Sequence, residues 1–163
     1  GGVFSSSSRG NNYGGDTNLR VDKSGDQLYV KFNPSSSGST CSQFGTALPA
    51  SAVVVSGEVE LYNNDPTSYN RDHQMSRVTG SWSEGLITYN NRPGITSPSA
   101  TVSASNGGWQ RWWVYAAHIE NERNAGTRYG WNVRDTGGNI LSDWATYRSR
   151  EASEKPRLHV VFY

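Results

Sequence analysis

The chain has 163 residues, which is a usual length for one domain with a substantial buried core. Fifteen basic and fourteen acidic residues give a formal net charge of +1, and this balance argues against a dedicated nucleic-acid binder. No apolar run is long enough to span a bilayer, so membrane insertion is not expected. The single cysteine, Cys41, cannot form an internal disulfide.

Short segments with apolar side chains at every second position recur between turn signals, which is the spacing of strands. The expected strands are residues 3–8, 18–23, 27–33, 52–62, 73–79, 86–90, 101–104, 109–114, 128–135, 141–148 and 157–163. One segment, residues 115–124, is expected to form a short helix that ends before Gly126. The pattern predicts an all-β sandwich or barrel with one short helix, formed by residues 1–163 as a single domain.

Two of these strands carry further expectations. The segment 52–62 has the strongest apolar alternation, and Gly57 in its middle is a candidate for a β-bulge. The last segment, 157–163, is also rich in apolar residues. Because an apolar edge strand invites aggregation, we expect this segment in the interior of a sheet.

The order of several motifs resembles a known family. The motifs are YGGDTNLRV at 13–21, LYVKF at 28–32, LPASAV at 48–53, EVELY at 58–62, WSE at 82–84, ITYNNRP at 87–93, YGW at 129–131, YRSRE at 147–151 and PRL at 156–158. Together they resemble the DNRLRE-type carbohydrate-binding modules, which are non-catalytic domains of secreted polysaccharide lyases, alginate lyases included, and of cell-surface proteins. The resemblance implies an antiparallel jelly-roll β-sandwich, glycan binding, an extracellular location and often a structural calcium.

Alternation separates the aromatic residues into inward and outward sets. If Trp112 and Val114 are in the core, their neighbours Arg111 and Trp113 point outward. The same argument on the other strands gives an outward set of Tyr29, Lys31, Arg111, Trp113, Arg134, Trp144 and Arg148. Aromatic faces pack on the C–H surfaces of sugars, and arginine binds carboxylates through two parallel hydrogen bonds. We expect these seven residues to bind ligand on one sheet; a solvated face with scattered exposed aromatics is the alternative.

A possible metal site involves the glycine-rich loop at Asp16. With a distant carboxylate such as Glu151, Asp16 could hold the calcium that the family implies. An Asx-turn at Asp16 together with an ion pair between Arg20 and Glu151 is the alternative. Trp82, between Ser81 and Ser83 in a turn, is expected to pack against the core.

The sequence offers no catalytic motif. Its histidines, His73, His118 and His159, are far apart, and neither a metal-binding nor a nucleophile motif is present. The favoured hypothesis is a non-catalytic module that binds an extracellular, anionic polysaccharide of the uronate type, such as alginate. It would be tethered to a catalytic domain or packed beside neighbouring protomers. A structural domain of a surface adhesin or filament and a small polysaccharide lyase are the alternatives.

Overall fold

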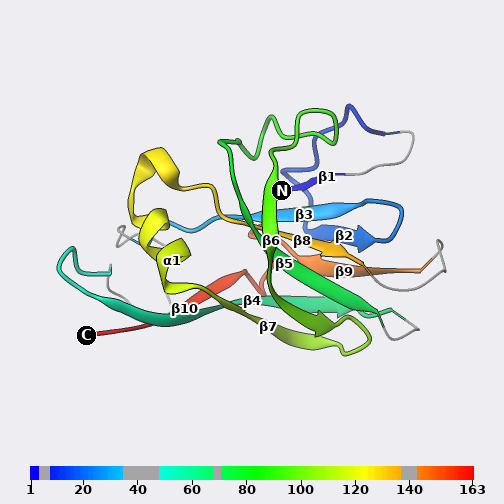
Figure 1. The fold of residues 1–163 in the computed structure, drawn as a ribbon. Helices are drawn as coiled ribbons and strands as arrows, with labels where there is room; N and C mark the ends of the chain where they lie inside the picture. The colour runs from blue at the N-terminus through cyan, green and yellow to red at the C-terminus, as the bar shows by residue number, and fades with distance from the viewer. Residues whose placement is uncertain (4–7, 35–47, 68–70, 137–142) are drawn as a thin grey trace.

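The computed structural model describes residues 1–3, 8–34, 48–67, 71–136 and 143–163. In these ranges the strands are β1 (Gly2–Val3), β2 (Asn18–Asp22), β3 (Gln27–Val30), β4 (Val54–Asp65), β5 (Asp72–Val78), β6 (Ile95–Ser103), β7 (Gly108–Val114), β8 (Trp131–Asp135), β9 (Trp144–Arg148) and β10 (Arg157–Phe162). One helix, α1 (Ala116–Arg123), is followed by a 3-10 turn, Ala125–Thr127. The predicted all-β sandwich with one short helix is confirmed (Figure 1).

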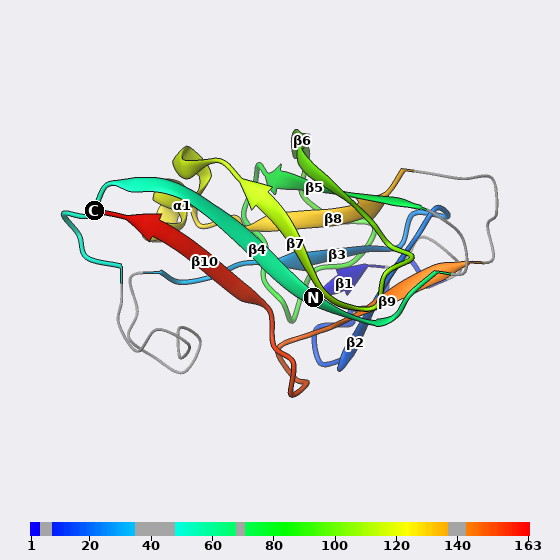
Figure 2. The ribbon, with the colours of Figure 1, turned by 90° about the horizontal axis from the view of Figure 1, so that it is seen from below.

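All strand pairs are antiparallel, and they form two sheets. The first has the order β1-β3-β8-β5-β6, and the second has the order β10-β4-β9-β2 with β7 on the other side of β4. Strands β2 to β9 are distributed between the sheets as in a jelly roll. Strand β10 extends the second sheet, where it pairs with the first half of β4 while β9 pairs with its end (Figure 2).

The core lies between the sheets and is formed by the inward side chains of the alternating strands. In β7, Trp112 and Val114 are fully buried, whereas Arg111 and Trp113 are exposed. This confirms the predicted alternation. Removing one large apolar side chain from water stabilises the folded state by about 1.5–3 kcal/mol. The burial of several such side chains on one face of each strand therefore determines which face points inward.

Helix α1 lies at one end of the sandwich (Figure 1). Its Ile119 is fully buried in the main core. A side chain at Gly57 of β4 would collide with Ile119 and with the carbonyl oxygen of His159, which explains glycine at that position. Gly57 is therefore a close-packing site, and the predicted bulge there is wrong because Gly57 pairs in regular register with both Val160 and Val114. None of the described helices is long and apolar enough to cross a membrane.

Several expected elements differ from the structure. In the described residues β10 pairs only with β4, so the expectation of an interior strand is wrong; the half-buried Leu158 and Val160 cover the core from the edge. Residues 86–90 form turns, because Asn91 accepts from the amide of Thr88 and donates to the carbonyl of Leu86. Strand β6 begins at Ile95 rather than at residue 101. Of the expected strand 3–8, residues 4–7 lie outside the described ranges, as do Cys41 and residues 141–142.

Candidate functional site

The outer face of the second sheet carries a dense array of aromatic and charged side chains, which we call the tryptophan face. Its members are Trp109, Arg111 and Trp113 of β7, Glu58, Glu60 and Tyr62 of β4, and Arg157 and His159 of β10. They lie in rows because strand register places Arg111 and Arg157 on either side of Glu60, and Trp109 beside Tyr62. The three strands run side by side on the near side of the molecule in Figure 2.

Glu60 lies at the centre of this face and is covered by three basic side chains. Its carboxylate accepts from Arg111 Nε at 2.8 Å and from Arg157 at 3.3 Å, and His159 Nε2 lies 3.1 Å away. The Glu60 side chain is only 2% exposed although it points to the outside of the sheet. Burial by itself would raise the pKa of Glu60, but the hydrogen bonds from His159 and Arg111 hold the pKa below its ordinary value.

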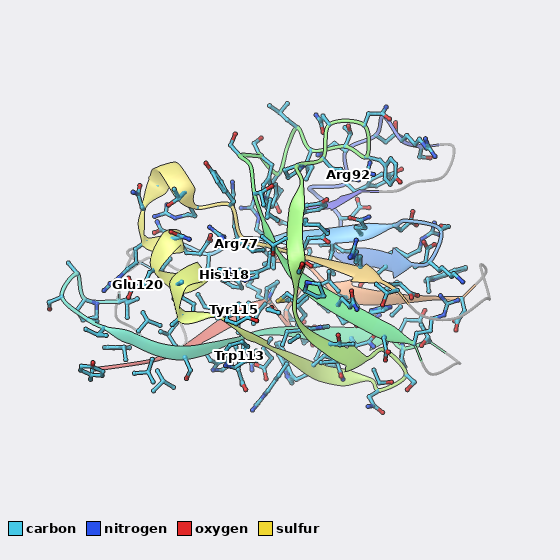
Figure 3. The ribbon with its side chains drawn as sticks, in the orientation of Figure 1. Arg77, Arg92, Trp113, Tyr115, His118 and Glu120 are labelled. Atoms are coloured by element: carbon cyan, nitrogen blue, oxygen red, sulfur yellow. The ribbon has the colours of Figure 1, made fainter. Side chains whose placement is uncertain are left out.

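The aromatic residues of the face contact one another and the arginines. Tyr62 and Trp109 meet edge to face with ring centroids 5.3 Å apart, and the Arg157 guanidinium lies 3.6 Å from the centre of the Trp109 ring. Trp113 remains 43% exposed. It meets the ring of Tyr115 at 4.6 Å (Figure 3). These contacts restrict the rings, so the exposed indole can accept an apolar ligand surface with little further loss of side-chain freedom.

Only two of the seven predicted ligand-binding residues, Arg111 and Trp113, lie on the tryptophan face. Trp144 belongs to the same sheet but lies far from Trp113 along the length of β4. Trp113 pairs with Glu58 in the first half of β4, whereas β9, which contains Trp144, pairs with β4 near its end, at Asp65. The seven residues from Glu58 to Asp65 correspond to about 23 Å of strand, and Trp144 lies beyond the level of Asp65. Its ring faces the guanidinium of Arg20. The two tryptophans, which belong to the predicted ligand-binding set, therefore do not share one surface patch.

The other four predicted residues lie away from the tryptophan face. Tyr29, Lys31 and Arg134 belong to the first sheet or the end of its strand β3, so the seven do not share one sheet. Arg148, in β9, donates to Asn18 at 3.0 Å and lies 3.6 Å from Glu154.

Tyr29 is the clearest error of the alternation argument. It is 1% exposed, because a second small cluster with Val78 and Ile87 covers the outer side of β3. Burial raises the pKa of its hydroxyl to about 12. Trp82 packs against this cluster, as expected, with its ring 5.7 Å from that of Tyr29. Lys31 lies over the outer side of Trp82, 4.6 Å from the ring centre.

The alternation argument missed Glu58, Glu60, Tyr62, Trp109, Arg157 and His159. A signal for the β4 residues exists in the sequence, because Glu60 and Tyr62 alternate with the apolar Val59 and Leu61. Which strands lie beside β4 cannot be read from that pattern, since Arg157 is 97 residues away from Glu60 along the chain.

The predicted calcium ligands lie near the same end of two paired strands. The amide of Ser149 donates to the carbonyl of Thr17, which brings the segments that contain Asp16 and Glu151 together. Glu151 accepts from Arg150 at 2.8 Å, and Arg20 pairs with Asp26 and Asp22 rather than with Glu151. Calcium takes six to eight oxygen ligands. The described residues contain no group of three or more metal-ligand side chains, so they do not fit such a site without many backbone or water ligands.

The three histidines do not meet. His73 is fully buried, with Nδ1 2.9 Å from the Tyr147 hydroxyl. His118 lies beside Tyr115, and burial, with a smaller effect of Arg77, lowers its pKa (Figure 3). His159 belongs to the tryptophan face. They are therefore in three separate environments, and His118 is linked to the tryptophan face through Tyr115, which contacts Trp113.

Exposed tryptophan and arginine side chains on one face of an antiparallel sandwich can pack on sugar rings and bind their polar groups. The comparison with known families agrees: the chain belongs to carbohydrate-binding module family 96, whose profile matches residues 3–162. No curated protein matches the chain.

Proposed function

We propose that this module binds an extracellular, anionic polysaccharide of the uronate type, such as alginate, through the tryptophan face and catalyses no reaction itself. The observation that carries the proposal is the exposed Trp113 beside an array in which Glu60 holds Arg111 and Arg157 in place. The module would keep a tethered catalytic domain, or a cell surface, at the polymer. Family membership supports the carbohydrate class; the DNRLRE-type assignment, the uronate preference and the secreted or cell-surface location remain predictions.

The two halves of a uronate match the two kinds of side chain on the face. The C–H surface of a pyranose ring packs on an indole, as on Trp113. A carboxylate accepts two parallel hydrogen bonds from a guanidinium, which has five donor N–H groups. The Arg111 side chain is 63% exposed and its described contact with Glu60 uses Nε, so its terminal nitrogens can serve a ligand.

Affinity at this face should be modest. Exposed ion pairs contribute about 0.2–1 kcal/mol each, so a single site should bind between roughly micromolar and millimolar concentrations. Salt should weaken binding because the arginines are accessible to solvent.

Isothermal titration of the module with alginate, polygalacturonate and a neutral glucan tests the proposal. We expect binding to both uronate polymers, weakened by salt, and little binding to the neutral glucan. Preference for the neutral glucan would refute the anionic specificity and leave the aromatic face as a sugar platform. Absorbance of an unsaturated uronate product, if it appeared during incubation with pure module, would contradict the assignment as non-catalytic.

A further inference from the structure

A second surface lies beneath β10. A groove of about 910 Å³ is lined there by the inward side chains of β10, namely Leu158, Val160 and Phe162. Val30 and Phe32, at the end of β3, line it from the other sheet. The volume is within the range of about 300–1,000 Å³ that is usual for small-molecule sites. Strand β10 therefore separates two surfaces, since His159 belongs to the tryptophan face while Leu158 and Val160 line the groove.

The groove concentrates positive charge. Its charged lining residues are Lys31, Arg128, Arg148, Arg150, Lys155 and Arg157, against Glu84 and Glu151. The guanidinium of Arg157, however, lies on the tryptophan face, over Trp109 and beside Glu60. Without Arg157, five cations and two carboxylates give 5 − 2 = +3, whereas the whole chain has a formal charge of +1. The rest of the chain is therefore negative by two charges, +1 − 3 = −2, so the formal positive charge of the chain is concentrated around this groove.

Some of this charge is already neutralised and some is not. Arg150 pairs with Glu84 at 2.9 Å and with Glu151 at 2.8 Å. Within the described ranges, neither Lys31 nor Lys155 forms an ion pair, and both side chains are exposed. The Lys31 ammonium donates to the carbonyl of Trp82 at 2.7 Å and lies over the indole, which fixes its position at the groove.

We infer that this groove is a second binding site for an anionic polysaccharide, distinct from the tryptophan face. The apolar walls meet the C–H surfaces of the sugar rings, and the basic rim meets carboxylate or sulfate groups. The inference takes its ligand class from the proposed function but rests on different residues. Arg157 lines the groove and also lies over Trp109, so it marks the border between the two sites. A chain long enough to cross β10 contacts both sites, and its affinity gains from that bivalency.

The test uses the three lysines of the chain. The double substitution Lys31→Gln with Lys155→Gln removes two groove charges, and Lys23→Gln removes one charge from the turn between β2 and β3, outside the groove. At low salt, titration with long alginate should show binding by the double variant weakened roughly threefold to tenfold, because each exposed charge contributes modestly. Lys23→Gln should match the wild type. Equal affinity of the double variant and the wild type would overturn the inference.

Further variants and ligands distinguish binding in the groove from other causes of a lower affinity. Because Lys31 contacts Trp82, substitution of Lys31 also removes a packing contact. Lys155→Gln alone avoids this effect, so it should retain the wild-type melting temperature and still bind alginate more weakly. Loss of affinity in the groove variants with none in Trp113→Ala refutes the tryptophan face and supports the groove, and the reverse result does the opposite. Titration of the same variants with dextran sulfate, compared with alginate, measures whether the groove binds sulfate groups or carboxylates. An equal loss of affinity for single-stranded DNA would reveal general attraction of polyanions and would overturn a polysaccharide site.

Discussion

Arg111 and Glu60 are direct neighbours in the pairing of β7 with β4, and Arg111 Nε donates to Glu60 Oε1 at 2.8 Å. The carboxylate is almost fully covered, while the guanidinium is mostly exposed. The buried partner thus restrains an exposed cation on the surface of the sheet. A restrained arginine loses less conformational entropy when it binds a carboxylate than a free one would.

Glu60→Gln should lower the free energy of unfolding by about 1–3 kcal/mol at neutral pH, because the charged acceptor of three basic groups is lost. The folded state lowers the pKa of Glu60, so its stabilising effect is complete above the unfolded pKa and is lost as pH falls through the folded pKa. The difference between variant and wild type should therefore shrink below the ordinary glutamate pKa of 4.5. Denaturant unfolding across acidic and neutral pH measures it.

Glu58→Gln is the matched control, since Glu58 lies two residues away on the same outer face and forms no ion pair among the described residues. It should change stability little at any pH. If the unfolding free energy of Glu60→Gln stayed below that of the wild type by a constant amount down to strongly acidic pH, the shape of the side chain, rather than its charge, would explain the lower stability.

Trp112→Ala and Trp82→Ala should differ in their effect on stability. Trp112 is fully buried and its indole N–H donates to the carbonyl of His73, so its loss should cost about 3–5 kcal/mol. Trp82 is half-buried, and its indole N–H donates to the carbonyl of Tyr129. We expect a smaller loss, about 1–3 kcal/mol, measured by denaturant unfolding. A larger cost for Trp82→Ala than for Trp112→Ala would contradict this assignment of the core.

The alternation of β7 could be predicted from sequence because one side of that strand is solvent and the other is core. Trp112 and Trp113 were assigned correctly for this reason. The same rule failed for Tyr29, since the turn segment that contains Ile87 covers the outer side of β3 and buries both faces. Periodicity alone cannot show such a covering segment.

The composition of the candidate site could be predicted only in part. Arg111 and Trp113 were found from local alternation, but Arg157 and His159 reach Glu60 from the far end of the chain. Their contribution depends on the pairing of β10 with β4 and on its register. Register depends on packing against the other sheet, which local sequence does not specify.

The calcium prediction is tested by thermal unfolding with and without chelator. Because Arg150 holds Glu151 and the described residues offer few other carboxylates there, we expect EDTA to leave the melting temperature unchanged. A bound calcium would instead raise the melting temperature through binding to the folded state alone. A decrease with EDTA that calcium reverses in the wild type, but not in Asp16→Ala, would establish the site.

The most direct test of the tryptophan face compares two tryptophans of one sheet by titration with alginate. Trp113 and Trp144 are 43% and 40% exposed, but only Trp113 lies on the face. A contact between two aromatic rings contributes about 0.5–1.5 kcal/mol, and we expect a similar contribution from one sugar ring on an indole. Trp113→Ala should therefore weaken binding roughly twofold to tenfold while the protein remains folded. Trp144→Ala should bind as the wild type does. If Trp144→Ala lost affinity and Trp113→Ala kept it, the tryptophan face would not be the binding site.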